Sequence, residues 1–75
     1  MKLNKAIGFQ MRVQRNLREL PLDLVAERMG YQSKNTVSYY ELGHGDITVD
    51  FLLRFCDAVG CDYRQVLEDA AAMAK

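Results

Sequence analysis

The stretch "GYQSKNTVSYYELG", residues 30–43, determines which fold the chain can adopt. Polar residues fill its first half, and Val37 and Tyr40 then follow at the spacing of one helix face. A glycine stands at each end, where chains commonly leave a helix. These features predict a turn and then a short helix over about residues 34–42, with Ser33 as its N-cap. The outward side of that helix would carry Lys34, Asn35, Ser38 and Tyr39.

The segment before this stretch predicts another helix, which ends at Gly30. Pro21 suits its first turn, because the amide hydrogen that proline lacks would have no partner there. The predicted apolar side of this helix comprises Leu22, Val25, Ala26 and Met29. Gly30 can adopt a positive φ without a Cβ penalty, and Ala26 is small enough for a second helix to cross closely over it. Two helices with so short a connection predict a helix-turn-helix, whose second helix offers its first side chains to the major groove of DNA.

Three further helices and no strand are predicted for the rest of the chain, over about residues 4–18, 48–60 and 63–72. Thr48 and Asp62 are expected to cap the last two of these helices. In the first of these helices the apolar residues that roughly follow the helical period are Leu3, Ile7, Met11 and Leu17. The second is expected to place Phe51, Leu52, Phe55, Cys56 and Val59 inward, and the third has Val66, Leu67 and Ala70 on one side. The chain is therefore expected to be one all-α domain over residues 1–75, a compact bundle of five helices.

The composition is that of a small globular domain whose charge is unevenly distributed. Its 75 residues are 49% hydrophobic, enough for one core, and ten bases balance ten acids. Residues 1–38 hold seven of the bases and three of the acids, whereas residues 39–75 hold three bases and seven acids. Because a polyanion meets only one face of a protein, overall neutrality does not exclude binding to nucleic acid. Chance segregation of surface charge explains the asymmetry equally well.

The sequence contains no pattern typical of a membrane protein, an exported protein, a metalloprotein or an enzyme. No run of about eighteen apolar residues predicts a membrane span, and no signal peptide is evident, so a cytoplasmic location is expected. Cys56 and Cys61 match no metal-ligand or redox spacing, and we expect reduced packing residues rather than a disulfide. His44 has no metal-binding or catalytic partners in the pattern, and no glycine-rich phosphate loop occurs. We therefore expect no enzyme, metal, cofactor or small-molecule ligand.

Three segments together resemble the lambda-repressor-like helix-turn-helix family, which includes phage repressors and Cro proteins. They are "LPLDLVAERMGY" (20–31), "NTVSYYELG" (35–43) and "TVDFLLRFCDAVGCDYRQVL" (48–67). The resemblance extends from about residue 7 to residue 67, and its specificity comes from the combination, since each segment alone would be weak. It implies a five-helix DNA-binding domain in which the second and third helices form the helix-turn-helix.

The resemblance also implies that the third helix contacts base edges in the major groove. Lys34, Asn35 and Tyr39 match positions that usually face bases, and Ser38 lies beside them. The chemistry agrees, since lysine can donate to guanine O6 and N7, and asparagine can form two hydrogen bonds with adenine. Tyr39 could contact a thymine methyl group or a phosphate. The alternative is that all four residues form only the solvated face of a short helix.

A structural ion pair is a further implication of the resemblance. Arg15 and Glu41 occupy positions where the family commonly pairs an arginine of the first helix with a glutamate that ends the third. Such a pair would orient the third helix rather than contact DNA or act as a catalytic acid. Its net contribution to the free energy of unfolding could be small.

Some positions depart from the family pattern, and the departures concern contacts with phosphate. Pro21 and Leu22 replace the serine or threonine and the glutamine that commonly begin the second helix, and Leu42 replaces a frequent polar residue. The turn is also one residue longer than the commonest form. Fewer phosphate contacts would lower affinity for every DNA sequence alike. The candidate substitutes are Gln32, Ser33, Thr36, His44, Lys2, Lys5, Arg12 and Arg18. An ordinary loop role is the alternative for His44.

The predicted function is that of a sequence-specific, double-stranded DNA-binding transcriptional regulator. A homodimer on a palindromic operator is expected, because one small module buries little DNA surface. Control by protein concentration would make it a Cro-like repressor or a restriction–modification controller. The dimer contact is expected within residues 62–75, unless their apolar side chains merely cover the first and fourth helices. These side chains are Tyr63, Val66, Leu67, Ala70 and Met73. The alternative function is a protein-interaction module or antitoxin-type partner with weak or no DNA binding, which the neutral charge favours.

Overall fold

The computed structural model describes residues 1–75 and contains five α-helices and no strand. The helices are α1 (Leu3–Leu17), α2 (Leu22–Arg28), α3 (Asn35–Glu41), α4 (Val49–Val59) and α5 (Tyr63–Met73). Each begins and ends within a few residues of its predicted bounds, so the prediction of an all-α, five-helix fold is confirmed. None of these helices combines the length and the apolar character that a membrane span requires.

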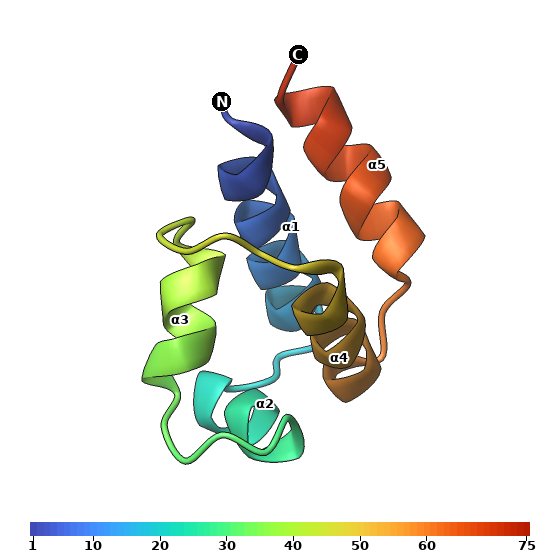
Figure 1. Cartoon of the computed structure of the whole chain (residues 1–75). Helices are drawn as coiled ribbons and strands as arrows, with labels where there is room; N and C mark the ends of the chain where they lie inside the picture. The colour runs from blue at the N-terminus through green and yellow to red at the C-terminus, as the bar shows by residue number, and fades with distance from the viewer.

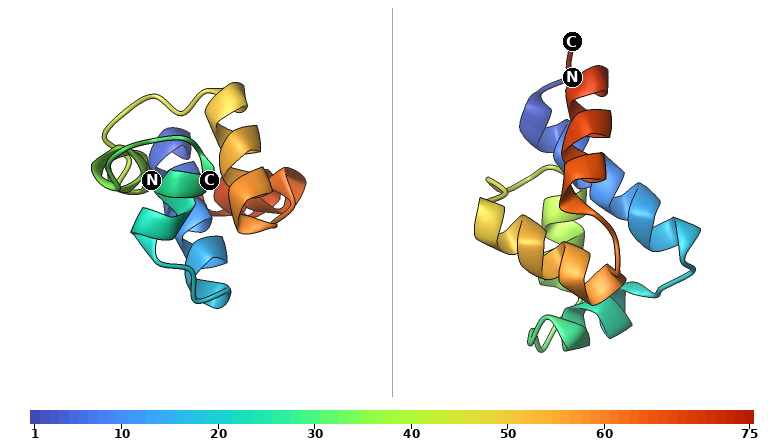
Figure 2. Two further views of the ribbon diagram at one scale, coloured as in Figure 1. Left: turned by 90° about the horizontal axis from the view of Figure 1, so that it is seen from below. Right: turned by 90° about the vertical axis from the view of Figure 1, so that its right-hand side faces the viewer.

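Helix α1 occupies the centre of the arrangement and contacts α3, α4 and α5. Helix α5 runs antiparallel along one side of α1, which brings the two termini to the same end of the molecule (Figure 1 and Figure 2). Helix α3 stands on the other side of α1, and α2 lies at the end opposite the termini. Because α2 contacts both α3 and α4, it joins the lower ends of these two helices.

Helix α4 supplies more of the buried core than any other helix. All five inward residues predicted from its pattern are buried, and Phe55 is fully enclosed. The hydroxyl of Thr48 accepts a hydrogen bond from the amide of Phe51 at 3.1 Å, which caps the first turn. Gly60 ends the helix at φ +84°, a left-handed conformation that residues with a Cβ rarely adopt. Pattern, caps and burial therefore agree throughout α4.

Helix α1 does not bury the whole side that its periodicity predicted. Leu3 and Leu17 are 51% and 71% exposed, so the four apolar residues that roughly follow the helical period do not form one buried side. The buried residues of α1 are instead Ala6, Gly8, Met11 and Arg15. A Cβ atom on Gly8 would collide with the carbonyl oxygens of Tyr40 and Glu41. Helices α1 and α3 therefore cross backbone against backbone, and the two leucines lie outside this contact.

The connection between α2 and α3 has the predicted helix-turn-helix form. Val25, Ala26 and Met29 are buried on the inner side of α2. After Gly30, which has φ +86°, the chain turns and the amide of Tyr31 donates to the carbonyl oxygen of Ala26 at 2.9 Å. This hydrogen bond closes the end of α2 and fixes the direction in which the turn leaves it.

Helix α3 begins without a side-chain cap on its own N-cap residue. That residue is Lys34 rather than the predicted Ser33. The hydroxyl of Ser33 nevertheless accepts a hydrogen bond from the amide of Asn35 at 3.1 Å. Ser33 therefore satisfies one of the free amides at the start of the helix, although it lies one residue before the N-cap position. Further along α3, Val37 is fully buried and Tyr40 is half-buried.

Candidate nucleic-acid interface

The start and the outer side of α3 carry the four side chains that were predicted to contact base edges. Lys34 and Asn35 are exposed, and neither side chain takes part in a hydrogen bond or ion pair. Tyr39, one turn after Asn35, is 51% exposed, whereas Ser38 is half-buried. Because residues four apart lie on the same side of a helix, Lys34 is followed by Ser38 and Asn35 by Tyr39. The structure thus brings the four predicted base-facing residues onto one side of α3.

A buried ion pair holds the end of α3 against α1. Arg15 Nε donates to Glu41 Oε2 at 2.8 Å, and a second guanidinium nitrogen donates to Glu41 Oε1 at 3.0 Å. The remaining nitrogen donates to the carbonyl oxygen of Leu20 at 2.9 Å, where the chain leaves α1. Arg15 and Glu41 are only 8% and 5% exposed. The two charges compensate each other, and the fork geometry fixes the orientation of α3.

The loop after α3 is attached to α1 by Asn4, a residue that belongs to no motif of the sequence. The Asn4 amide nitrogen donates to the carbonyl oxygen of Gly45 at 2.6 Å. Its amide oxygen accepts a hydrogen bond from the backbone amide of Ile47 at 2.8 Å. No local sequence signal could have revealed this role, because the partners lie 41 and 43 residues away. Asn4 therefore fixes the start of α1 against the loop that follows α3.

Aromatic contacts position the ring of Tyr39. It meets Tyr40 edge-on with ring centroids 5.5 Å apart, and it lies 5.7 Å from the ring of His44. Tyr40 in turn packs on Phe51 of the core at 4.4 Å. A Cβ atom on Gly45 would approach the rings of Tyr39 and Tyr40 to 2.6 Å, so only glycine fits beside them. The exposed ring of Tyr39 is thus supported from behind by the core.

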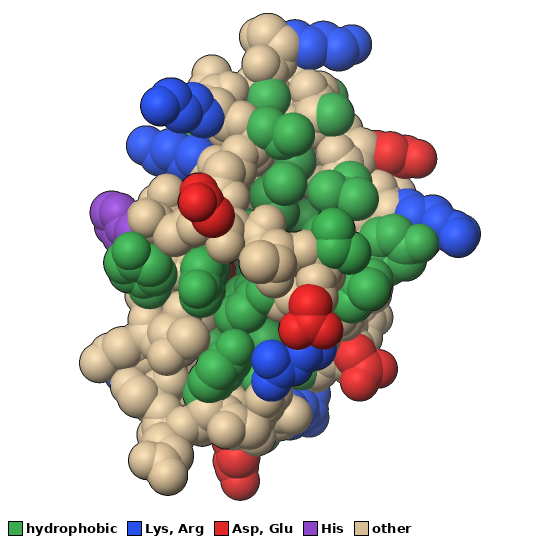
Figure 3. All heavy atoms as spheres, viewed as in Figure 1, with side chains coloured by type: hydrophobic (Ala, Val, Ile, Leu, Met, Phe, Trp, Pro, Cys, Tyr) green, Lys and Arg blue, Asp and Glu red, His purple; other side chains and the backbone are tan.

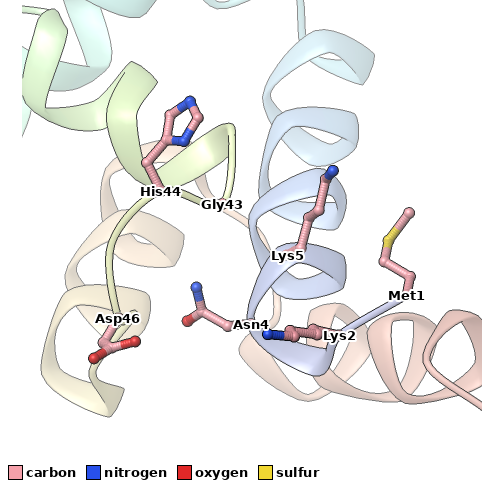
Figure 4. Close-up of a pocket in the computed structure, with 7 residues that line it drawn as sticks. All are labelled: Met1, Lys2, Asn4, Lys5, Gly43, His44 and Asp46. Atoms are coloured by element: carbon pink, nitrogen blue, oxygen red, sulfur yellow. The ribbon is translucent and has the colours of Figure 1, made fainter.

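Basic side chains line an open hollow between the start of α1 and the loop after α3. This hollow has a volume of about 620 Å³. Figure 4 shows Lys5 and His44 extending to the same side of it, while Asp46 lies at the far end of the loop. Its lining residues are Met1, Lys2, Asn4, Lys5, Gly43, His44 and Asp46. The structure therefore brings together three of the predicted backbone-contact candidates: Lys2, Lys5 and His44.

The other backbone-contact candidates lie elsewhere. Gln32 and Ser33 are exposed in the turn before α3, and Thr36 is half-buried in its first turn. Arg18 is exposed at the end of α1, where its guanidinium donates to the Gln14 side-chain oxygen at 2.7 Å. In Figure 3, Lys and Arg side chains gather beside the histidine at the edge above α3. In the same view, acidic side chains lie next to Lys and Arg side chains over α4 and α5, so the two charges are mixed on that part of the surface.

The residues proposed for a dimer contact divide into two groups. Val66 and Ala70 are fully buried within the protomer, so including them in a subunit contact was wrong. They face inward because α5 packs closely along α1. Leu67 is 36% exposed, and Tyr63 and Met73 are half-buried. Only these three of the five remain available at the surface of α5.

The two cysteines are free thiols that lie against each other at the end of α4. Cys56 is buried and Cys61 is half-buried. A hydrogen bond from the Cys56 thiol lowers the pKa of Cys61 to about 7, and the positive charge of Arg18 acts in the same direction. The same hydrogen bond, together with burial, raises the pKa of Cys56. No group of three or more His, Cys, Asp or Glu side chains is arranged to hold a metal ion.

Comparisons with known proteins agree with this geometry. The sequence profile of a helix-turn-helix domain matches residues 6–71. A crystal structure of the clp gene regulator ClgR from Corynebacterium glutamicum superposes with a TM-score of 0.93 at 27% identity, covering 100% of this chain and 96% of that one. A second ClgR structure gives a TM-score of 0.90 at 27% identity, with coverage of 99% and 78%. No curated protein sequence matches significantly.

Proposed function

The chain belongs to the helix-turn-helix domain family, and we propose that it is a sequence-specific, double-stranded DNA-binding regulator of transcription. One observation carries this proposal. Helix α3 is anchored to α1 through a buried ion pair, while Lys34 and Asn35 on its outer side have no partner within the chain. A rigidly held helix with free polar side chains is what direct contact with base edges requires.

In the proposed complex, α3 enters the major groove with its first turn leading. Lys34 donates to guanine O6 and N7, and Asn35 forms two hydrogen bonds with adenine N6 and N7. Tyr39 contacts a thymine methyl group or a phosphate, and Ser38 lies beside it. Contacts with the DNA backbone, which position the domain, come from the turn before α3 and from the hollow between the start of α1 and the loop after α3. The residues proposed for them are Gln32, Ser33, Thr36, Lys2, Lys5 and His44.

We also propose that the chain is a lambda-repressor-like regulator of the phage-repressor or Cro type. The order of five helices and the Arg15–Glu41 pair support this narrower assignment. A repressor of this type in the cytoplasm would respond to its own concentration, without enzymatic activity or a small-molecule ligand. The similar ClgR is named as a clp gene regulator, which supports a role in gene regulation here. It does not identify the genes that this chain controls.

A homodimer on a palindromic operator is the proposed active form. One module of this size contacts one half-site, and two half-sites about one helical turn apart increase both affinity and specificity. The exposed parts of Tyr63, Leu67 and Met73 are the proposed contact, since apolar side chains continue along this region of α5. Figure 3 shows a band of hydrophobic atoms on this side of the molecule.

A protein-interaction module on the same scaffold is the second candidate. The zero net charge favours it, as do the apolar residues Leu22 and Leu42 at positions where the family often has polar ones. An antitoxin-type partner would use the outer side of α3, or α5, to bind another protein. The two candidates differ in what they require of Lys34 and Asn35. Only base contact demands a lysine and an asparagine at these positions.

Selection from a pool of random duplexes tests the proposal. We expect enrichment of an inverted repeat, and a log affinity that falls steeply with log salt concentration. Lys34→Ala and Asn35→Ala should each relax specificity at one base pair per half-site, at a cost of about 1–3 kcal/mol. Gln65→Ala, an exposed change on α5, serves as the control and should leave specificity unchanged. No enrichment at low salt would instead support the interaction module.

A further inference from the structure

Arg12 differs from the other arginines of the chain, because it alone has no partner. The chain has six arginines, and five of them are held by hydrogen bonds, an ion pair or an aromatic ring. The five held arginines and their partners are Arg15 with Glu41, Arg18 with Gln14, Arg28 with Ala58, Arg54 with Met29, and Arg64 with Tyr63. Arg12 is exposed on α1 and forms none of these contacts. Its charge and its five N–H donors are therefore free for an external ligand.

Arg12 lines a small recess where α1, α2 and α3 meet. The recess has a volume of about 140 Å³. It is lined by Arg12, Arg15, Leu22, Ser38, Glu41 and Leu42. Since Arg15 and Glu41 compensate each other in a buried ion pair, the net charge around the recess is that of Arg12. The recess thus combines one free cation, one hydroxyl group and two leucine side chains.

The recess lies beside the proposed base-contacting surface. Ser38 in its lining follows Lys34 by one helical turn. The other lining residues come from α1, α2 and the end of α3, so the recess lies on the flank of α3 next to α1 and α2. The major groove is bordered by the two sugar–phosphate backbones, about 12 Å apart. A helix that enters the groove therefore brings its flanks close to phosphates. In the proposed complex, a cation on this flank of α3 would therefore meet a backbone phosphate.

We propose that this recess binds one phosphodiester of the DNA backbone. The Arg12 guanidinium donates to a non-bridging phosphate oxygen, and the Ser38 hydroxyl donates to the same phosphate. Leu22 and Leu42 pack against the adjoining deoxyribose. The proposal rests on the proposed function, and it assigns Ser38 to a backbone phosphate instead of to the base edges. It also explains how α2 can begin without the polar residue that the family commonly places at Leu22: the phosphate donor comes from α1 instead.

The test is a double-mutant cycle on the operator enriched from the random pool. Each phosphate bordering a half-site is replaced in turn by an uncharged methylphosphonate, with its symmetric mate in the other half-site. Affinities of the wild type and of Arg12→Ala are measured for each duplex. At one phosphate the replacement should weaken wild-type binding about tenfold and leave Arg12→Ala without further loss. Arg12→Ala should also lower the salt slope by about one per bound protomer.

Matched variants separate this site from a general effect of charge. Arg18, the C-cap residue of α1, was also predicted to contact phosphate, but its guanidinium is already held by Gln14. Arg18→Ala therefore removes an equal charge and should not couple to the phosphate that Arg12 binds. Ser38→Ala should couple to the same phosphate as Arg12→Ala, with a smaller loss of about threefold. Thermal unfolding of Arg12→Ala should match the wild type, because Arg12 has no partner. If Arg12→Ala unfolds at a lower temperature than the wild type, Arg12→Gln takes its place in the double-mutant cycle.

The outcomes distinguish the two proposals. Equal losses for the wild type and Arg12→Ala at every phosphate would overturn the phosphodiester site and leave the DNA-binding proposal intact. Coupling of Arg18→Ala in place of Arg12→Ala would overturn it in the same way. A wild type that binds no duplex at low salt would overturn both.

Discussion

Helices α3 and α4 both contact α1, yet their residues are used in different ways. Five of the eleven residues of α4 are buried, and the helix has a side-chain cap at its start and a left-handed glycine at its end. Only two of the seven residues of α3 are buried, Val37 and Glu41, and its N-cap residue makes no capping bond. Helix α4 is held in place by its own buried apolar side chains, whereas α3 is held mainly by contacts that its end makes with α1.

This difference separates stability from recognition within one small domain. The anchors of α3 are the Arg15–Glu41 pair, the crossing at Gly8, and the loop held by Asn4. All three act at the end of α3, away from Lys34 and Asn35. Side chains on the outer surface of α3 can therefore change without disturbing the fold, whereas changes in α4 disturb the fold first.

The largest effect is expected in α4. Phe55→Ala removes a fully buried aromatic side chain, and the lost transfer free energy and the resulting cavity should cost about 3–5 kcal/mol of unfolding free energy. In a 75-residue domain this is a large share of the total. Chemical denaturation measures it. A loss below about 1 kcal/mol would show that α4 is not the main support of the core.

A smaller loss is expected at the main anchor of α3. Glu41→Gln leaves the buried Arg15 guanidinium without its counter-charge and should cost about 2–3 kcal/mol of unfolding free energy. DNA affinity should fall as well, although Glu41 does not face DNA. Denaturation and binding assays measure the two effects. Replacing Arg15 and Glu41 together by leucine is the control, and its stability should return close to that of the wild type. Unchanged stability and affinity in Glu41→Gln would argue against the anchoring role.

The loop anchor should contribute less. Asn4→Ala removes the hydrogen bonds to Gly45 and Ile47, at a cost of about 1–2 kcal/mol of unfolding free energy. The matched control is Asn16→Ala on the same helix, where the asparagine is exposed and its side chain makes no hydrogen bond. Thermal melts of the two variants provide the comparison. Equal melting temperatures would mean that the loop is held mainly by its aromatic packing.

The smallest effect on stability is expected on the outer side of α3. Lys34→Ala and Asn35→Ala remove exposed side chains without partners, so the unfolding free energy should change by less than about 0.5 kcal/mol. Denaturation curves of both variants should overlay the wild type. A marked loss would mean that these side chains support the helix, and the contrast between α3 and α4 would fail.

The sequence predicted best those helices whose signals, such as periodicity and caps, lie within a few neighbouring residues. The buried residues of α4 follow from one helical period and two caps, and all five were identified. The pattern of α1 was a poorer guide to burial, because α1 packs largely through alanine, glycine and the arginine of an ion pair, whose burial does not follow from a hydrophobic period. Val66 and Ala70 were assigned to a dimer because periodicity marks an apolar side but does not say what covers it.

The candidate site was predictable only in part. Spacing and family resemblance placed Lys34, Asn35, Ser38 and Tyr39 together on one helix. The role of Asn4 depends on contacts that span more than half of the chain, so no window of sequence could reveal it. Arg12 differs from the other five arginines because each of those has a partner, and only the folded structure shows these partners.

The crossing at Gly8 has a mechanical consequence. Peptide groups of α1 and α3 meet there with no side chain between them, so no rotamer change can absorb a shift in their relative position. Helices α1 and α3 are therefore expected to move together as one rigid unit. In a symmetric pair of subunits, the angle between the two α1 axes would translate directly into the distance between the two α3 helices. If the proposed dimer binds two half-sites, the packing between its subunits would therefore set the spacing between half-sites that it tolerates.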